Sequence, residues 1–458
     1  MKARLKVLIA GDAFCALLAM ATGFLIRFGY KEAGTEMFSG RFVRIVFFVL
    51  ILLVVSHIFE LYKRGKHSSR QELFPEILKA ATISFLLMSG IFYLAPDLVI
   101  GRGLLAISLV AFVVYQVTWH SIFSLGVGHP AFSERIIIIG TGPLAVTTGE
   151  LVEMSRGHFN HQLLGYASSS IENGPVSVPK DKIIGEASDL MNLSRQLKAT
   201  RIIVSISEEE GISALREVLL NCKLHGMEIL DTPAMYEQVT GKLMLENINI
   251  MWLIYANGFR RTALISAIKR MTDIILSIIG LILTIPLSPL IALLVKIDSP
   301  GPIFYSQVRV GYAGQCFVLY KFRTMAPDAE SGTGAIWAQE DDPRLRPIGK
   351  FLRKCRLDEI PQLYNVLKGD MSFVGPRPER PEFVDMLKTS IPFYQKRHFV
   401  KPGITGWAQI NYPYGASVED AYEKLRFDLY YIKHMSPLQD ALIVLQTFKV
   451  IMLGKGGR

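Results

Sequence analysis

The hydrophobic residues at the start of the chain fall into four blocks separated by polar loops. The blocks cover residues 5–26, 43–62, 77–96 and 104–125. A helix needs about 20 predominantly apolar residues to cross the hydrocarbon core of a bilayer, and each block is close to that length. The pattern therefore predicts a membrane protein with a four-helix transmembrane bundle over residues 1–128.

Asp12 interrupts the first block. An ionisable residue within a membrane helix often marks function, but a place near the helix end is equally consistent with an interfacial role. Basic residues precede this block, as they do in a signal peptide, yet no small-residue cleavage site is evident and three more blocks come after it. We therefore expect a retained membrane anchor.

The charges of the loops predict the orientation of these helices. Seven basic residues lie before the first block and between the second and third, whereas five lie on the opposite side. Basic residues are enriched in cytoplasmic loops, so this bias places both ends of the chain in the cytoplasm. The two sets are Lys2, Arg4, Lys6, Lys63, Arg64, Lys66 and Arg70, and Arg27, Lys31, Arg41, Arg44 and Arg102.

A different pattern begins near residue 129. Four consecutive isoleucines, residues 136–139, lead into Gly140-Thr-Gly142-Pro-Leu-Ala145, which is typical of a buried parallel strand that turns into a helix. Strand-like segments then alternate with helical ones, which predicts a Rossmann-like α/β middle domain over residues 129–258. The further strands are expected at 163–168 and 201–206 and the helices at 186–197 and 212–225.

The glycine pattern is weak evidence for a dinucleotide. The acidic residue expected about 20 positions after the glycines would fall near residues 167–170, where the sequence is Ala-Ser-Ser-Ser. We therefore expect a structural or regulatory role for the middle domain, with binding of NAD or CoA as the alternative.

A fifth apolar segment, residues 274–295, contains no charge but is interrupted by Pro286, Ser288 and Pro289. Each proline removes a helix hydrogen bond and kinks the chain, and a serine hydroxyl can satisfy a carbonyl that the kink frees. A kinked spanning helix would place everything after it outside the cell, far from cytoplasmic nucleotides. We therefore predict a re-entrant helix over about 272–296 that breaks at Ser288-Pro289 and returns to the cytoplasmic side.

Composition narrows the classes of partner. Half of the 458 residues are hydrophobic and the net charge is +10, with a mean hydropathy of +0.31. A basic protein of this kind suits an anionic membrane surface or a phosphorylated substrate. No basic–aromatic repeat or known nucleic-acid module is present, so nucleic acid is not an expected partner. The four cysteines are scattered without a CxxC pair, which indicates a reducing compartment and argues against zinc.

The most informative chemistry lies at Asp358-Glu359, an acidic pair between Arg353 and Arg377. One carboxylate of such a pair can attack phosphorus while its neighbour holds a divalent cation, and arginines can grip phosphate oxygens through paired hydrogen bonds. Acidic residues followed by a proline, here Pro361, are also typical of an ordinary helix start. The surrounding motifs favour a catalytic role for the acidic pair over an ordinary helix start.

Those motifs give the chain a family resemblance. They are Ser299-Pro-Gly-Pro302, Gln307-Val-Arg309-Val-Gly311, Lys321-Phe322-Arg323, Asp342-Pro-Arg344, Lys368-Gly-Asp370, Val374-Gly-Pro-Arg377-Pro378 and Lys401-Pro-Gly-Ile-Thr-Gly-Trp407-Ala-Gln409. With them, residues 259–458 resemble the monotopic, mainly α catalytic domain of the bacterial sugar transferase family. The whole chain resembles the large membrane subfamily that initiates exopolysaccharide, capsule and O-antigen synthesis. The tail, residues 412–424, is similar to the PEP-CTERM-associated exopolysaccharide branch.

The resemblance implies an enzyme that transfers a sugar-1-phosphate from a UDP-sugar donor to undecaprenyl phosphate and releases UMP. It implies that Asp358 forms a covalent phosphosugar intermediate and that Glu359 holds Mg²⁺. It also implies that several further residues bind phosphate or substrate: Lys321, Arg323, Arg353 and Arg377, and at weaker positions Gln409 and Asp428.

The same resemblance implies a multi-pass protein of the bacterial inner membrane with its catalytic domain on the cytoplasmic face. Dimerisation through the membrane and middle domains is compatible with the sequence, and the sugar stays open. Two other functions are compatible with parts of the sequence. One is a membrane-tethered, NAD-dependent nucleotide-sugar dehydratase or epimerase, and the other is a non-catalytic scaffold of a polysaccharide assembly.

Overall fold

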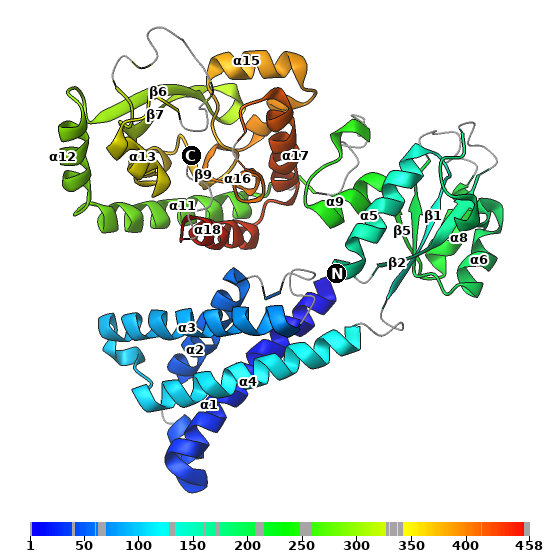
Figure 1. Ribbon diagram of the computed structural model, residues 1–458, viewed down its shortest axis with the longest axis horizontal. Coiled ribbons are helices and arrows are strands. Elements are labelled where there is room, and N and C mark those ends of the chain that lie inside the picture. The colour runs from blue at the N-terminus through cyan, green and yellow to red at the C-terminus, as the bar shows by residue number, and fades with distance from the viewer. Residues whose placement is uncertain are drawn as a thin grey trace. The chain divides into compact units, whose positions relative to one another are not determined.

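The protein forms two compact units, Met1–Met235 and Tyr236–Arg458 (Figure 1). The computed structural model describes residues 2–38, 42–59, 61–62, 70–127, 133–159, 161–169, 175–206, 215–247, 258–259, 261–326, 329, 337, 342–413 and 415–452. The predicted division into domains at residues 128 and 258 stays a prediction.

The first unit begins with apolar helices. They are α1 (Lys2–Phe38), α2 (Phe42–Ile58), α3 (Arg70–Leu94) and α4 (Arg102–Val127). Among the residues described, three stretches are long and apolar enough to cross a membrane, namely Leu5–Tyr30, Leu73–Tyr93 and Arg102–Phe123. The helix α2 is apolar but has only 17 residues. The predicted membrane protein is therefore confirmed, whereas the four-span bundle stays a prediction.

A polar centre joins three of these helices. Asp12 on α1 has no exposed surface and accepts a 2.7 Å hydrogen bond from Gln116 Nε2 on α4. The same amide nitrogen lies 3.1 Å from Ser56 Oγ on α2, and His120 Nε2 lies 3.1 Å from Asp12 Oδ1. Asp12 is thus enclosed by its own unit. Since burial of an unpaired carboxylate is costly, these partners stabilise the packing of α1, α2 and α4.

The first unit also contains a five-stranded sheet in which every strand pair is parallel and the order is β3-β2-β1-β4-β5. Ile137 and Ile139 of the central strand β1 pack with α6 and α8, and Figure 1 shows α5 on the opposite face. The bounds are β1 Glu134–Ile139, α5 Pro143–Phe159, β2 His161–Ser168, β3 Ile183–Glu186, α6 Leu190–Gln196, β4 Arg201–Val204, α8 Arg216–Leu224, β5 Glu228–Asp231 and α9 Thr232–Thr240.

The glycine turn after β1 is packed tightly within this unit. Gly140 has φ +117°, and a Cβ atom there would lie 2.8 Å from the carbonyl oxygen of Ser205. The carbonyl oxygen of Thr141 accepts hydrogen bonds from the backbone N–H groups of Ser177 and Val178, at 2.8 and 3.3 Å. The need for glycine at this turn therefore follows from packing within the unit and requires no bound dinucleotide.

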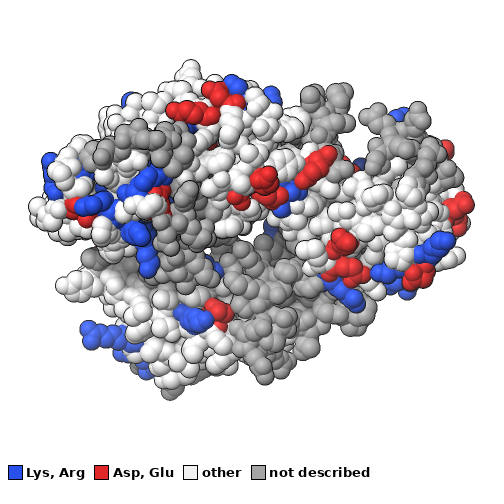
Figure 2. All heavy atoms as spheres, turned by 45° about the horizontal axis from the view of Figure 1, so that its top comes forward, with Lys and Arg blue, Asp and Glu red and all other residues white. Residues whose placement is uncertain are grey.

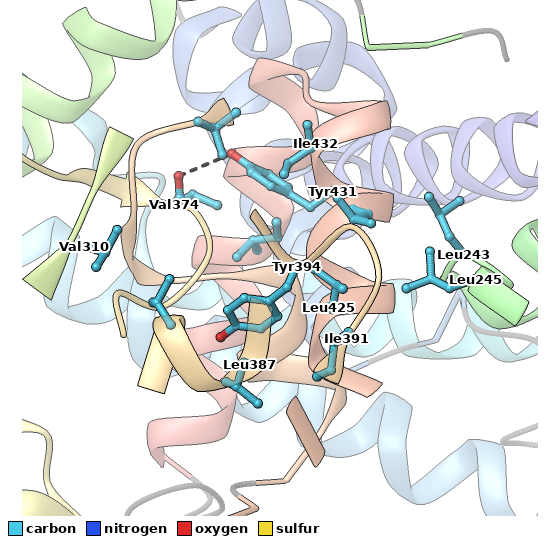
Figure 3. Close-up of a cluster of buried hydrophobic side chains, with 14 residues drawn as sticks. Leu243, Leu245, Val310, Val374, Leu387, Ile391, Tyr394, Leu425, Tyr431 and Ile432 are labelled. Carbon is cyan, nitrogen blue, oxygen red and sulfur yellow. Dashed lines mark hydrogen bonds between the residues drawn. The ribbon is translucent and has the colours of Figure 1, made fainter. Parts of the chain in front are cut away.

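In the second unit, a small antiparallel hairpin and several short helices pack together with longer helices. In chain order they are α11 Ala263–Thr284, α12 Ser288–Asp298, β6 Phe304–Val310, β7 Cys316–Phe322, α13 Pro347–Lys354, α14 Gln362–Lys368, β8 Ser372–Val374, α15 Pro381–Ser390, β9 Gly403–Thr405, α16 Trp407–Asn411, α17 Val418–His434 and α18 Pro437–Met452. Figure 3 shows the main core, in which Tyr394 and Tyr431 pack with aliphatic side chains of several elements. The Tyr431 hydroxyl donates to the carbonyl oxygen of Val374 at 3.3 Å.

The helices α11 and α12 are bent by 64° at a break of three residues, 285–287. Ser288 begins α12, and its hydroxyl donates to the carbonyl oxygen of Thr284 at 2.8 Å. One side of α11 exposes apolar side chains at helical spacing, whereas the other is fixed to the unit by polar contacts. The exposed residues are Leu264, Ile268, Met271, Ile275, Ile278, Ile279, Ile282 and Leu283.

Three residues make the polar contacts of α11. Lys269 Nζ donates to the carbonyl oxygen of Val374 at 2.9 Å and lies 2.7 Å from Asp440 Oδ2. Arg270 donates to the last carbonyl groups of α14, and Asp273 accepts from Ser372 Oγ and from the backbone N–H of Phe373. The helix is therefore an integral part of the second unit and presents only its apolar side outward.

Candidate active site

The acidic pair lies on a short 3₁₀ turn, Leu357–Glu359, between α13 and α14. Arg356 directly before the turn has φ +58°, a left-handed conformation that is uncommon for a residue with a side chain. After this reversal the side chains of Asp358 and Glu359 enter the unit, where the two residues are only 5% and 7% exposed.

Three cations surround Glu359. Arg377 Nη2 lies 2.8 Å from Glu359 Oε1, Arg356 Nη1 lies 3.5 Å from it, and Lys321 Nζ lies 3.6 Å from it. Burial raises the pKa of Glu359, but the charges of Arg377, Lys321 and Arg356 outweigh burial and hold that pKa well below its ordinary value. Glu359 is therefore a fixed negative charge at physiological pH.

Asp358 is in the opposite situation. Burial and the neighbouring charge of Glu359 raise the pKa of its carboxyl group, while Lys321, Arg353 and Arg377 act to lower it. Within the described part of the chain, no side chain or backbone group forms a hydrogen bond or ion pair with this carboxylate. A buried carboxylate with a raised pKa and free lone pairs is a better nucleophile than a solvated one.

Lys321 lies near the end of β7 and is a cation whose charge depends on pH in the mildly alkaline range. Burial lowers its pKa to about 8, with the charge of Glu359 opposing this change and that of Arg377 assisting it. Its ammonium group is therefore ionised at neutral pH and approaches titration under mildly alkaline conditions.

Two predicted arginines differ in their placement. Arg353, at the end of α13, donates from Nε to Thr324 Oγ1 at 3.1 Å, and its charge acts on Asp358. Arg323 instead donates to the carbonyl oxygens of Ser299 and Pro300, at 2.6 and 3.0 Å. The structure thus brings Arg353 to the acidic pair, whereas the Arg323 guanidinium holds the loop after α12.

A cavity of about 530 Å³ extends from the cations that hold Glu359. Its basic residues outnumber its acidic ones, so it suits an anionic ligand. The predicted residues Arg377, Gln409 and Asp428 all line it. The remaining charged residues of the lining are Arg356, Glu379, Arg397 and Lys424.

Within this cavity, Asp428 and Gln409 have local partners. Asp428 forms a buried ion pair with Arg397 at 2.9 Å, and Arg397 also donates to the carbonyl oxygen of Arg377 at 3.0 Å. Gln409 Nε2 donates to the carbonyl oxygen of Ile404, while its Oε1 has no hydrogen-bond partner in the described ranges. Asp428 therefore orients a basic residue and does not itself offer a free carboxylate.

Sequence reasoning overlooked Arg356, Arg397 and Lys424. Arg356 stands inside the motif that ends at Asp358, so its position alone was a usable signal. Arg397 and Lys424 come from segments far along the chain, and only folding brings them to the cavity. Figure 2 shows Lys and Arg side chains gathered on part of the second unit, at the left of that view.

The acidic pair also fits the donor type that Mg²⁺ prefers. Among the described residues, no group of three or more His, Cys, Asp and Glu side chains could hold a metal ion alone. Mg²⁺ is commonly bound by one or two carboxylates together with water and substrate phosphates. Glu359, which keeps its negative charge, is therefore a suitable ligand once a phosphorylated substrate supplies further oxygens.

The part of the chain that carries this site is similar to known proteins. Residues 264–454 match the family described as bacterial sugar transferase. The chain is 38% identical to the UDP-N-acetylgalactosamine-undecaprenyl-phosphate N-acetylgalactosaminephosphotransferase of Aeromonas hydrophila over 257 residues, which are 56% of this chain and 60% of that protein. It is 43% identical to the UDP-glucose:undecaprenyl-phosphate glucose-1-phosphate transferase of Escherichia coli (strain K12) over 182 residues, 39% of each chain.

A shorter relative is covered more completely. The uncharacterized sugar transferase EpsL of Bacillus subtilis (strain 168) is 38% identical over 193 residues, which are 41% of this chain and 89% of that protein. The chain spans less than two thirds of the two longer relatives, and most of the short one.

Proposed function

Because the chain belongs to the bacterial sugar transferase family, we propose that it transfers a sugar-1-phosphate from a UDP-sugar to undecaprenyl phosphate and releases UMP. One observation carries the proposal. The buried Asp358 carboxylate, free of partners among the described residues, adjoins Glu359, whose cations Arg356 and Arg377 line a basic cavity. This arrangement suits attack on an activated phosphate.

The reaction proceeds in two displacements. A carboxylate oxygen of Asp358 attacks the phosphorus that bears the sugar, an O–P bond forms, and the pyrophosphate P–O bond breaks as UMP leaves with the electron pair. An oxygen of the lipid phosphate then attacks the same phosphorus and releases Asp358 as a carboxylate. Two anionic substrates thus never need to occupy the site together, which predicts ping-pong kinetics.

The surrounding cations stabilise this chemistry. Lys321, Arg353 and Arg377 offset charge that develops on the transferred phosphoryl oxygens. When bound, Mg²⁺ held by Glu359 would neutralise the pyrophosphate and make UMP a better leaving group. Arg356 and Arg377 connect the acidic pair to the cavity, which offers room for the nucleotide part of the donor.

The apolar side of α11 supports a place at the membrane surface. We propose that α11 and α12 form a re-entrant helix in the inner (cytoplasmic) membrane, which keeps Asp358 on the cytoplasmic face beside the lipid phosphate. We also propose that α1–α4 are four transmembrane helices. The parallel sheet, with strand β1 and its glycine turn, supports a Rossmann-like middle domain.

The sugar and the pathway branch are left to experiment. The relatives named above act on N-acetylgalactosamine and on glucose according to their names, so both sugars are candidates. We also propose that the protein belongs to the PEP-CTERM-associated exopolysaccharide branch, on the basis of the sequence of residues 412–424. Homodimerisation is likewise a proposal that size measurements in detergent would test. The NAD-dependent alternative is not put forward, because packing within the unit accounts for the glycine turn.

A reconstitution experiment tests the function directly. Purified protein is incubated with Mg²⁺, undecaprenyl phosphate and a panel of radiolabelled UDP-sugars, and UMP release and labelled lipid are measured. We expect both products with one or a few sugars. Exchange of labelled UMP into UDP-sugar without lipid would demonstrate the two-step mechanism. Absence of both products with every sugar would contradict the proposal.

A further inference from the structure

A segment that precedes the family match is built into the second unit. Residues 236–246, here called the strap, belong to the compact unit that begins at Tyr236, whereas the family match begins at residue 264. The strap therefore lies outside the family match but belongs to the same compact unit as the matched residues.

The strap enters the core of the unit. Leu243 and Leu245 are buried with Leu425 and Leu429 of α17, and Figure 3 shows both strap leucines at one side of that cluster. The backbone N–H of Leu243 donates to the carbonyl oxygen of Arg426 at 3.1 Å. In return, Arg426 Nε donates to the carbonyl oxygen of Leu243 at 2.9 Å. These bonds fix the strap along one side of α17.

Further polar contacts connect the strap to the end of α17 and the start of α16. The buried Glu237 carboxylate lies 2.6 Å from Lys433 Nζ and also contacts His434 Nε2. The indole Nε1 of Trp407 donates to the carbonyl oxygen of Gly241 at 2.8 Å. Both ends of the α16–α17 segment are thus bonded to the strap.

The same α16–α17 segment forms a wall of the basic cavity. Gln409 of α16, together with Lys424 and Asp428 of α17, lines the cavity, while Arg426 between them turns to the strap. A continuous series of bonds leads on from Asp428. Arg397 pairs with Asp428 and donates to the carbonyl oxygen of Arg377, whose side chain holds Glu359.

We propose that the strap positions the donor-binding cavity. In this proposal Glu237 and Arg426 are positioning residues that hold α17, and α17 in turn places Asp428, Arg397 and Arg377 for the diphosphate of the nucleotide sugar. The inference rests on the proposed function, since it names the residues that shape the donor site. Neither Glu237 nor Arg426 touches the substrate.

The test uses the full-length protein in lipid nanodiscs and the variant Glu237→Gln. Loss of the carboxylate removes the ion pair between Glu237 and Lys433, so α17 is held less firmly. We expect the dissociation constant of UDP, measured by calorimetry, and the KM of the UDP-sugar to rise about 10-fold, as for the loss of one charged hydrogen bond. The kcat is expected to fall less than the donor affinity, because the variant disturbs the placement of Arg377 but leaves the Asp358 nucleophile itself unaltered.

A double-mutant cycle with Arg397→Lys shows whether the strap acts through the cavity residues. If Glu237→Gln and Arg397→Lys disturb the same placement of Arg377, their effects on UDP binding are not additive. The dissociation constant of the double variant is then at most about twofold higher than that of the single variant with the lower affinity for UDP. Asp385→Asn is the control, because Asp385 is 68% exposed in an ion pair with Lys388 on α15. It is expected to leave UDP binding unchanged.

The outcomes separate the two proposals. If the wild type binds UDP and transfers sugar while Glu237→Gln binds UDP equally well, the strap inference is wrong and the proposed function stands. A fall in kcat with unchanged UDP affinity, or fully additive losses in the cycle, also overturns the inference by showing a merely structural role. If the wild type fails to bind UDP, the donor assignment fails and the strap proposal falls with it.

Discussion

Each unit of the protein buries an aspartate among polar neighbours, and the two sites differ in what those neighbours leave free. Asp12 in the first unit accepts hydrogen bonds from Gln116 and contacts His120, with no exposed surface. Asp358 in the second unit has no bonded partner among the described residues. The cations beside it bond its neighbour Glu359 and line a cavity.

Under the proposed function, the difference separates a structural acid from a reactive one. Around Asp12 the acceptor capacity is used by neighbouring helices, which fixes their packing. Around Asp358 the cations bond Glu359 and leave the Asp358 carboxylate without a bonded partner among the described residues, so this carboxylate and the cations can engage a phosphate together. Burial alone therefore does not identify a catalytic acid in this molecule.

The largest contrast is expected from Asp358→Asn. The amide cannot form the phosphosugar intermediate, so kcat should fall at least about 1,000-fold, comparable to the loss of other covalent nucleophiles. UMP release and lipid labelling measure this effect, and thermal unfolding should shift by no more than a few degrees. Full turnover by this variant would remove the nucleophile assignment.

The matching change in the first unit is Asp12→Leu. It leaves Gln116 and His120 buried with a lost partner, so unfolding should become easier by about 3 kcal/mol, the lower end of the cost of breaking a buried pair. The melting temperature in detergent reports this, whereas kcat of the folded protein should stay within about twofold. Thr118→Val, which removes an exposed hydroxyl on α4, serves as control. A loss of kcat without a loss of stability would assign Asp12 to the chemistry.

Gly140→Ala tests the first unit at a second place. The left-handed φ and the close Ser205 carbonyl predict a loss of about 2 kcal/mol in unfolding free energy, within the range for strained backbone. The sequence alone favours retention of most activity in this variant, and the structure adds that its stability is lowered. Transfer assays below the melting temperature check the first point. A selective rise in KM at unchanged stability would instead indicate a ligand at the glycine turn.

The smallest effect concerns the pH dependence of donor binding. Burial lowers the pKa of Lys321 to about 8, so its ammonium charge is present below that pH and lost above it. The KM of the UDP-sugar should therefore rise above pH 8, by up to about 10-fold per pH unit for a single proton. Lys321→Arg keeps the charge and should flatten the profile.

The stability of the fold is expected to change with pH in the opposite direction from the donor affinity. This difference tests whether Lys321 is the group that titrates. Because the pKa of Lys321 is lower in the folded protein than in the unfolded chain, the unfolded chain binds more protons between about pH 8 and 10.5. This group therefore makes the fold more stable as pH rises through that window. A melting temperature that falls together with donor affinity would contradict the assignment to Lys321.

The sequence predicted those features that local patterns encode. The family resemblance and the membrane character are confirmed, and the isoleucine run coincides with the buried central strand β1. The strands β3 and β5 at the two edges of the sheet were missed because neither is a run of buried residues like β4, which has the same length and was predicted. The helix α2 is shorter than its apolar block because it ends at Ile58, before residues 59–62 of that block.

The site was predictable where its residues are neighbours in the sequence. Asp358 and Glu359 are adjacent, and the motif spacing pointed to Arg353 and Arg377. The partner of Asp428 was not predictable, because Arg397 lies on another segment and only tertiary packing joins them. Arg323 is the opposite case. Its motif predicted phosphate binding, but its guanidinium donates to two backbone carbonyl groups, and no local pattern reveals these contacts.

At Arg356 the left-handed backbone lowers the stability of the fold, while the side chain supplies a charge to the candidate site. A glycine there would relieve a conformation that costs L-residues about 1–2 kcal/mol, although it would also loosen the unfolded chain. It would at the same time take a guanidinium away from Glu359 and from the lining of the cavity. An arginine at this turn therefore combines a backbone cost with a positive charge beside Glu359 and the cavity.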